Sequence, residues 1–187
     1  MRHDPDSIIL TRIVGAAADR DFLTQTASLL REVVAHGGAI GWVTPPPAEE
    51  VEELLRGVVA DSPEGNACLM AAWSGAQLLG LGYWSRYTRA TNKPHVDIVK
   101  LGVDPAARGQ GIGRRIMQEL IQAARDNQVE VVTLDLRGDN LGGIALYESL
   151  GFTRYGVLPR FVALGEDRYD KCFYALDLRE DTPVKRT

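Results

Sequence analysis

The chain has 187 residues, 45% of them hydrophobic, and a formal net charge of −4 at pH 7. This length and composition predict a single domain over residues 1–187, with a folded core from about residue 8 to residue 178. The net negative charge disfavours a nucleic-acid partner, which requires a basic face. No apolar run reaches the roughly 18 residues of a membrane span, and the first residues lack the apolar centre of a signal peptide. We therefore expect a cytoplasmic protein without nucleic-acid or membrane partners.

Hydrophobic periodicity and turn residues predict alternating strands and helices. In chain order we expect strand Ile8–Val14, helices Asp19–Ala35 and Ala48–Val59, a hairpin of strands Ala67–Trp73 and Leu78–Tyr87, strand Val96–Val103, helix Gly111–Arg125, strand Val129–Leu136, helix Leu141–Leu150, and strands Phe152–Leu158 and Cys172–Leu178. Strand Val129–Leu136 has a nearly continuous apolar centre, which is typical of burial on both faces. The two cysteines, Cys68 and Cys172, lie far apart and show no metal-ligand spacing.

The stretch from Val96 to Arg115 carries the strongest functional signal. A β-rich apolar run is followed by a glycine-rich loop that leads into an amphipathic helix. The first backbone N–H groups of a helix have no internal partner, and the helix dipole adds partial positive charge there. Glycines allow an anion to approach the backbone closely, and two arginines add full charges. The sequence therefore predicts an anion site formed by Arg108, Gly109, Gln110, Gly111, Ile112, Gly113 and Arg114.

This loop differs from two common phosphate-binding motifs. It lacks the Gly-Lys-Ser/Thr of a Walker loop, and its three glycines are too closely spaced for the G-x-G-x-x-G of a dinucleotide fold. From Arg108 to Gly113 it does match R/Q-x-x-G-x-G/A. In this it resembles the acetyl-CoA pyrophosphate loop of the GNAT N-acetyltransferase superfamily. The alternative is a glycine-rich strand–helix turn that binds no ligand.

A second block strengthens the resemblance. The superfamily pattern N-x-x-A-x-x-L-Y-x-x-x-G-F is matched about thirty residues downstream at Asn140, Leu146, Tyr147, Gly151 and Phe152. The chain departs from the pattern at Gly143, where alanine is usual, and a glycine inside a helix costs roughly 0.5–1 kcal/mol relative to alanine. The two blocks stand in the expected order, and the resemblance covers about Ile8 to Leu178.

The resemblance implies an α/β fold of the GNAT type, with a twisted mixed sheet, helices on both faces and two central parallel strands that splay apart. It implies acetyl-CoA as co-substrate and no metal. The cofactor would contact the anion loop, Asn140 and the backbone of Leu101, Gly102 and Val103. Gly102 is compatible with a β-bulge that directs main-chain groups at the acetyl moiety. Alternatively, Gly102 lies where a side chain does not fit.

Acetyl transfer to an amine requires proton handling. The amine must lose a proton, since a lysine-type amine has a pKa near 10.4, and the departing thiolate benefits from one. The developing oxyanion needs a hydrogen-bond donor, which the resemblance places on the backbone of the strand that contains Gly102. Tyr147 is the expected acid, because its phenol is protonated at neutral pH and the matching tyrosine of the superfamily points at the cofactor sulfur. Alternatively, Tyr147 is a packed core residue.

Two carboxylates are the main candidates for the base, and His36 and His95 are lesser ones, since a lone histidine more often hydrogen-bonds locally. Asp97 and Asp135 each lie in an otherwise apolar strand, where an unpaired carboxylate is costly. Each is therefore expected to be paired, neutral or functional. The structural alternative is an ion pair with Lys100, Arg137 or Arg160.

A closer resemblance refines these expectations. The segments His36–Trp42, Val99–Gly109 and Thr153–Pro159 resemble the tabtoxin-resistance acetyltransferase group. That resemblance implies Asp135 and Tyr147 as the proton-handling pair and the segment after the first helix as part of the acceptor side. Further pocket residues are expected among Asp19, Glu32, Trp42, Trp84 and Arg160.

The function expected from these features is acetyl-CoA-dependent acetylation of the primary amine of a small, amino-acid-like molecule such as a toxin or antibiotic. One alternative is acetylation of a protein N-terminus or lysine. Another is a non-catalytic acyl-CoA-binding sensor, against which the retained Tyr147 argues. The sequence leaves the acceptor, the acyl chain length and the oligomeric state open, although a homodimer is common in this fold.

Overall fold

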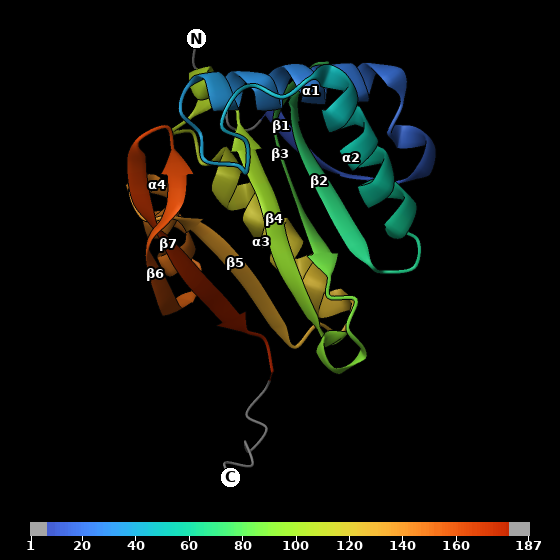
Figure 1. Ribbon diagram of the computed structural model, residues 1–187. Helices are drawn as coiled ribbons and strands as arrows, with labels where there is room; N and C mark the ends of the chain where they lie inside the picture. Colours follow the sequence, from blue (N-terminus) through green and yellow to red (C-terminus); the bar gives the residue numbers. More distant parts are fainter. Residues whose placement is uncertain (1–6, 180–187) are drawn as a thin grey trace.

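A seven-stranded mixed sheet with helices on both faces organises residues 7–179, the part of the chain that the computed structural model describes (Figure 1). The strands are β1 (Ile8–Ile13), β2 (Ala67–Ser74), β3 (Gln77–Arg86), β4 (His95–Val103), β5 (Val131–Arg137), β6 (Thr153–Leu164) and β7 (Asp167–Asp177). The α-helices are α1 (Arg20–Ala35), α2 (Ala48–Asp61), α3 (Ile112–Asp126) and α4 (Leu141–Ser149). The predicted fold class and the predicted order of elements are confirmed.

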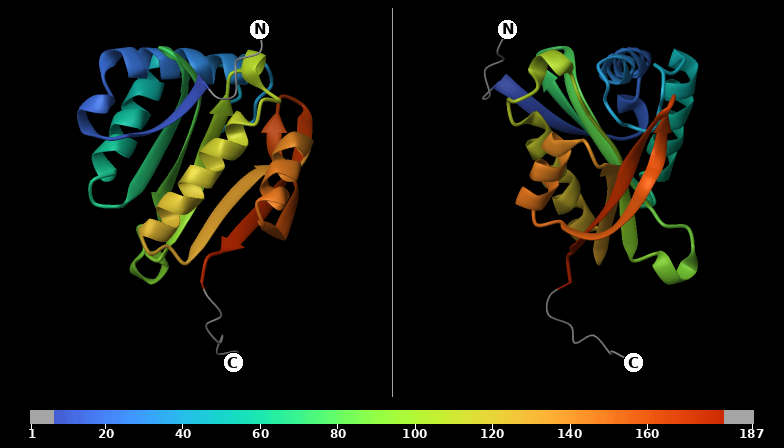
Figure 2. Two further views of the ribbon diagram at one scale, coloured as in Figure 1. Left: turned by 180° about the vertical axis from the view of Figure 1, so that it is seen from behind. Right: turned by 60° about the vertical axis from the view of Figure 1, so that its left-hand side comes forward.

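The sheet order is β1-β2-β3-β4-β5-β7-β6, and every neighbouring pair is antiparallel except β4–β5. Helices α1 and α2 cover β2, β3 and part of β4 on one face, whereas α3 and α4 lie on the other (Figure 2). Neither α1 nor α2 extends over β5, β7 and β6 (Figure 1). In the described part of the chain, the face of these three strands opposite α4 is therefore without a helix.

The last two strands are longer than predicted. The sequence predicts that β6 ends at Leu158, but the strand continues to Leu164. It also predicts that β7 begins at Cys172, whereas the strand begins at Asp167. Most of β6 is exposed, so it lacks the buried alternation that marks a strand in sequence. Its register against β7 also shifts after Leu158, near Arg160, whose φ is 57°. This irregularity interrupts the strand pattern without ending the strand.

The helix predictions agree with the structure to within about two residues at each end. Asp19 caps α1 by accepting a hydrogen bond from the Phe22 N–H at 2.8 Å, which explains why the helix begins there. Helix α3 packs on the sheet through one stripe of residues spaced by four, all of them at most 1% exposed: Ile112, Ile116, Leu120 and Ala124. Two buried clusters, one under α3 and α4 and one under α1 and α2, form the core on either side of the sheet.

The two central strands pair over only four positions. Residues His95–Ile98 of β4 align with Val131–Leu134 of β5, and beyond these positions the strands run on without pairing. The register of β4 against β3 also shifts, because Tyr83 faces Lys100 while Trp84 faces Ile98, which leaves Val99 as an extra residue. A bulge of this kind bends a strand. The predicted splay of the central parallel pair is therefore present, and it begins where β4 bulges.

Gly102 does not form this bulge. A Cβ on Gly102 would lie 3.0 Å from Cδ2 of Leu30, so α1 packs directly on the strand at this position. The alternative explanation from the sequence, a glycine where a side chain does not fit, is the one that agrees with the structure. The bulge at Val99 lies three residues earlier in β4.

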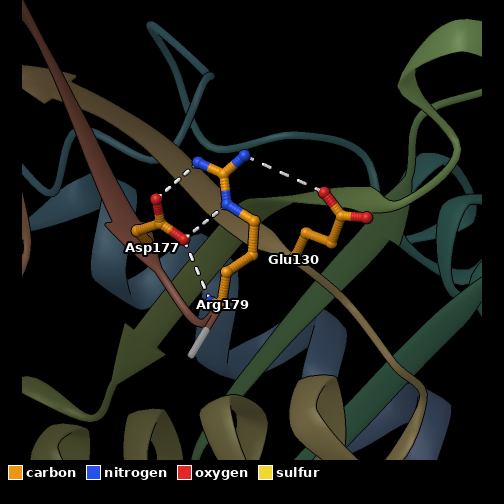
Figure 3. Close-up of polar contacts among 3 residues, drawn as sticks. All are labelled: Glu130, Asp177 and Arg179. Atoms are coloured by element: carbon orange, nitrogen blue, oxygen red, sulfur yellow. Dashed lines mark hydrogen bonds and ion pairs between the residues drawn. The ribbon is translucent and has the colours of Figure 1, made fainter. Parts of the chain in front are cut away.

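Exposed ion pairs lie at the end of β7. The backbone N–H and Nε of Arg179 donate to Oδ1 of Asp177 at 3.0 and 2.9 Å, and the guanidinium also approaches Glu130 (Figure 3). These hydrogen bonds hold the pKa of Asp177 at about 2. Exposed pairs of this kind contribute little stability. Between residues 7 and 179, no helix has the length and apolar character needed to cross a membrane.

Trp84 provides a test of the core under α3. Its side chain is fully buried, and its indole N–H donates to the Leu120 carbonyl at 3.1 Å. Trp84→Phe removes this bond and leaves volume unfilled, so the free energy of unfolding is expected to fall by roughly 1–3 kcal/mol. Urea denaturation followed by circular dichroism measures this. Trp42→Phe, at a half-buried ring, is the control with a smaller expected loss, and equal stability of the Trp84 variant and the parent would contradict the packing described.

Candidate active site

One cleft, with a volume of about 770 Å³, opens where β4 and β5 separate. Five segments line it: the chain after α1, the second half of β4, the loop before α3, the end of β5, and the first turns of α4. The structure thus brings together segments that are far apart in the sequence.

The loop before α3 forms an anion-accepting wall. Gly109 and Gly111 have φ values of +76° and +77°, which favour glycine, and a Cβ on either would meet nothing within 4 Å. The first backbone hydrogen bond of α3 runs from the Arg115 N–H to the Gly111 carbonyl at 3.1 Å. The N–H groups of the three preceding residues therefore lack helical partners. These residues, Ile112, Gly113 and Arg114, all line the cleft.

The side chains predicted for this loop divide into two groups. Arg108 and Arg114 line the cleft with the glycines, whereas Gln110 does not. The Arg114 guanidinium also donates to Oγ of Ser149 at 2.6 Å, which links the start of α3 to the end of α4. A backbone cradle with adjacent arginines fits a phosphate group.

Backbone groups of β4 form the second wall. The Gly102 carbonyl oxygen faces β3, since it lies 3.0 Å from where a Cβ on Gly80 would stand. Alternate residues of a strand direct their backbone groups to opposite sides. Leu101 and Val103 therefore direct theirs away from β3, where β4 has no partner strand, and both residues line the cleft. Of the three residues predicted here, Gly102 does not line it.

Asn140 caps α4 at the edge of the cleft. Its Oδ1 accepts a hydrogen bond from the Gly143 N–H at 3.0 Å. A Cβ on Gly143 would lie only 2.8 Å from Nδ2 of Asn140. Gly143 stands where the superfamily pattern has alanine, and the structure explains this difference, because the glycine leaves room for the capping amide of Asn140. Both residues line the cleft.

Tyr147 lies on α4 with its ring packed edge-on against Phe152, the ring centroids 5.8 Å apart. Only 9% of the residue is exposed, and burial raises the pKa of Tyr147 to about 12. The hydroxyl therefore keeps its proton through neutral pH. No hydrogen bond within residues 7–179 engages this hydroxyl, and Tyr147 lines the cleft. Its proton is thus available to a group bound there.

The two predicted carboxylates occupy different environments. Asp135 lines the cleft, its side chain is 40% exposed, and its Oδ2 lies 3.0 Å from Nζ of Lys171. Asp97 lies where β4 and β5 are still paired, outside the cleft lining, and accepts a hydrogen bond from Thr133 at 2.6 Å. Burial raises the pKa of Asp97, an effect that the Thr133 hydrogen bond opposes and the charge of Asp135 reinforces.

The ion-pair partners named from the sequence are wrong. Asp135 pairs with Lys171, because Asp135 faces Phe173 across the β5–β7 ladder and Lys171 is the diagonal neighbour. Arg137 instead pairs with Asp139. Lys171 could have been found only from the β5–β7 register, which the sequence does not reveal.

Lys100 is a cleft residue whose role the sequence did not indicate. Its Nζ donates to the Ile40 carbonyl at 2.8 Å and lies 3.8 Å from the centroid of the Trp42 ring. The Trp42 indole N–H donates in turn to Glu50 at 2.7 Å. Lys100 therefore fastens the chain between α1 and α2 to β4. The segment predicted for the acceptor side, His36–Gly38, lines the cleft together with Ala39 and Ile40.

The additional pocket residues expected from the sequence do not line the cleft. Asp19 caps α1, Glu32 pairs with His36, and Trp84 lies in the core. Trp42 contributes indirectly by holding Lys100. These aromatic and acidic residues serve the fold around the cleft rather than its surface.

The split sheet and its anion loop define the class of acyl-CoA-dependent N-acyltransferases that the sequence resembles. Residues 38–152 match the profile of the Acetyltransferase (GNAT) family. The chain belongs to this family, whose members use acetyl-CoA as acetyl donor. No group of three or more His, Cys, Asp or Glu side chains suited to a metal occurs between residues 7 and 179.

Individual relatives differ in their named activities. The chain is 42% identical over 101 residues to N-alpha-acetyltransferase RimI of Mycobacterium tuberculosis, an alignment that spans 54% of this chain and 61% of the relative. It is 30% identical over 153 residues to mycothiol acetyltransferase of Gordonia bronchialis, spanning 81% of this chain and 46% of the relative. The chain thus covers less than two thirds of either relative's length.

A solved structure shares the fold across nearly the whole chain. The phosphinothricin acetyltransferase of Sinorhizobium meliloti, determined in complex with AcCoA, superposes with a TM-score of 0.79 at 23% identity. The match covers 97% of this chain and 94% of that one. Membership of the tabtoxin-resistance group stays a prediction.

Gly111 tests the anion loop. Gly111→Ala places a Cβ in the open cradle, so the dissociation constant of acetyl-CoA is expected to rise roughly tenfold or more, about 1.4 kcal/mol. Calorimetry measures this affinity. Gly75→Ala is the matched control, because Gly75 also has a positive φ and open surroundings but lies in the β2–β3 turn. If both variants bound acetyl-CoA as the parent does, the loop would not hold the pyrophosphate.

Proposed function

We propose that this chain transfers the acetyl group of acetyl-CoA to the primary amine of a small, amino-acid-like molecule. The observation that carries the proposal is the convergence of three features on one cleft: the anion-accepting start of α3, the protonated Tyr147 and the carboxylate of Asp135. Each demand of acetyl transfer to an amine thus has a residue in the same cavity.

The cleft residues fit acetyl-CoA as a co-substrate. The loop Arg108–Arg114 would bind the pyrophosphate, and the unpaired backbone of Leu101 and Val103 would bind the pantetheine amides along the split. Asn140 would add a side-chain amide at the same edge. Bound acetyl-CoA would supply an activated thioester, and a backbone N–H of β4 would stabilise the oxyanion that forms on its carbonyl.

Two residues would move the protons. Asp135 accepts a proton from the acceptor ammonium, and the freed nitrogen lone pair forms a C–N bond to the thioester carbon. The C–S bond then breaks, and Tyr147 donates its proton to the departing sulfur. The second proton that the attacking nitrogen must lose goes to the Tyr147 phenolate, directly or through solvent, which leaves a neutral amide, the free thiol and a reprotonated Tyr147. We assign the base to Asp135 rather than Asp97 because Asp135 lines the cleft, whereas Asp97 lies below the split and is engaged by Thr133.

The acceptor class rests on two supports. The segment His36–Ile40 lines the cleft and resembles the tabtoxin-resistance group, whose members acetylate a small amino-acid-like toxin. The solved structure from Sinorhizobium meliloti is named for acetylation of phosphinothricin rather than of a protein. Lys100 also holds this segment against β4, through the Ile40 carbonyl and the Trp42 ring.

A second candidate function is acetylation of a protein N-terminus. The 42% identity to N-alpha-acetyltransferase RimI favours it. Acetyl-CoA consumption, measured by release of free thiol, separates the candidates when small amines are compared with short peptides. Turnover restricted to peptides would favour the second candidate, and no turnover with any amine would favour a non-catalytic acyl-CoA sensor.

Tyr147 provides the sharpest test of the chemistry. Tyr147→Phe keeps the ring and removes the proton, so kcat is expected to fall about 10²–10⁴-fold while acetyl-CoA affinity is retained. Steady-state kinetics and calorimetry measure the two quantities. Tyr174→Phe is the control, because Tyr174 is also buried but lies outside the cleft, where its hydroxyl donates to Glu148 at 3.1 Å. An unchanged kcat in the Tyr147 variant would remove it from the chemistry.

The pH profile identifies the base. If Asp135 is the base, Asp135→Asn should remove the acidic limb of the kcat/KM profile. Asp139→Asn, at another cleft carboxylate that pairs with Arg137, should leave the limb in place. The limb should also survive in Asp97→Asn. Loss of the limb in Asp97→Asn, with its retention in Asp135→Asn, would assign the base to Asp97.

A further inference from the structure

Lys100 is a partly buried cation in the cleft that makes no direct ion pair. Burial lowers the pKa of Lys100, and the charge of Glu50, which accepts a hydrogen bond from Trp42, opposes this effect. No Asp or Glu oxygen of the described residues lies within 4.0 Å of its Nζ. The Ile40 carbonyl accepts one of its three N–H groups, and the Trp42 ring faces the ammonium. A cation withdrawn from water is costly unless an anion or further hydrogen bonds compensate it. Because Lys100 lines the cleft, that anion can come from a bound molecule.

The acetyl-CoA phosphates are poorly placed to supply this anion. Lys100 contacts the segment between α1 and α2, on one face of the sheet. The anion loop leads into α3, which packs on the opposite face (Figure 2). Lys100 therefore belongs to the side of the cleft from which the acceptor would enter.

Asp135 lies on the same face, across the split. Its neighbours in β5, Leu134 and Leu136, pack into the core under α3 and α4, so Asp135 points to the opposite face. A cation on β4 and an anion on β5 thus line one cleft from its two sides. This arrangement is complementary to a molecule that carries an ammonium and a carboxylate at once.

We infer that the acceptor is an amino acid with a free carboxylate, and that Lys100 binds this carboxylate while the amine faces Asp135. The inference rests on the proposed function and makes Lys100 a specificity-determining residue. A charge-assisted hydrogen bond from Lys100 would favour an acid over the corresponding amide. A protein N-terminus, whose first α-carboxyl group is already an amide, would lack this contact.

Paired acceptors test the inference. The proteinogenic amino acids and the linear series from β-alanine to 6-aminohexanoate are each compared with the corresponding primary amide in the acetyl-CoA assay. The best acid is expected to have a kcat/KM roughly tenfold or more above that of its amide, mainly through KM. Lys100→Met should bring this ratio toward one, and Lys100→Arg should retain most of it.

Arg31→Met separates recognition from a structural role. Arg31 also fastens the segment between α1 and α2, through the Pro46 carbonyl, but lies outside the cleft lining. The ratio of kcat/KM for the acid to kcat/KM for its amide should be unchanged in Arg31→Met. If Lys100→Met lowered the rates for acid and amide equally, Lys100 would only hold the segment, and the inference would be overturned.

The parent enzyme alone gives a decisive result if a Lys100 variant fails to fold. No preference for any acid over its amide overturns the inference. Acetylation of amides or peptides, without acetylation of the free acids, would also overturn the inference. That result would still agree with acetyl transfer to an amine. Absence of transfer to every amine and peptide would instead remove the proposed function.

Discussion

The parting of β4 and β5 after four paired positions is the constraint on which the rest of the site depends. In a continuous sheet the backbone N–H and C=O groups of Leu101 and Val103 would form hydrogen bonds with a neighbouring strand. The extra residue at Val99 bends β4 away and leaves those groups unpaired. An unpaired strand edge inside a protein needs partners, and a ligand with amide groups in an extended chain supplies the right kind.

The split also places the anion-accepting start of α3 and the segment between α1 and α2 on opposite faces of one sheet. The start of α3 presents N–H groups on one face, and the segment between α1 and α2 shapes the cleft on the other. Donor and acceptor can therefore approach from different sides and meet between the strands. In residues 7–179 no helix covers β5, β7 and β6 on the face opposite α4, which leaves the approach to the cleft open on the face to which Asp135 points.

Features encoded by adjacent residues were predictable from the sequence. The cap of α4 at Asn140, the stripe of α3 and the glycine loop each depend on spacing within about a dozen residues. The two motif blocks also placed Tyr147 correctly on α4, where it lines the cleft. Local chemistry fixes such elements before tertiary packing is known.

Features that depend on register were not predictable. The partner of Asp135 is Lys171, which is set by the alignment of β7 on β5. The contact of Lys100 with Ile40 joins residues 60 positions apart, and no spacing rule connects them. The bulge at Val99 is likewise a relation between β4 and β3 rather than a property of β4.

The short β4–β5 ladder has a thermodynamic consequence. Past Ile98, β4 and β5 form no further ladder within residues 7–179, and side-chain contacts such as the Arg114–Ser149 hydrogen bond link the N-terminal and C-terminal parts there. A molecule seated in the gap would bridge both parts and would bind only when they are correctly juxtaposed. Occupancy and cooperative folding are then linked, because a ligand that binds only the native state stabilises it in proportion to the logarithm of its concentration. The opening that creates the cleft thereby makes the stability of the sheet depend on what fills it.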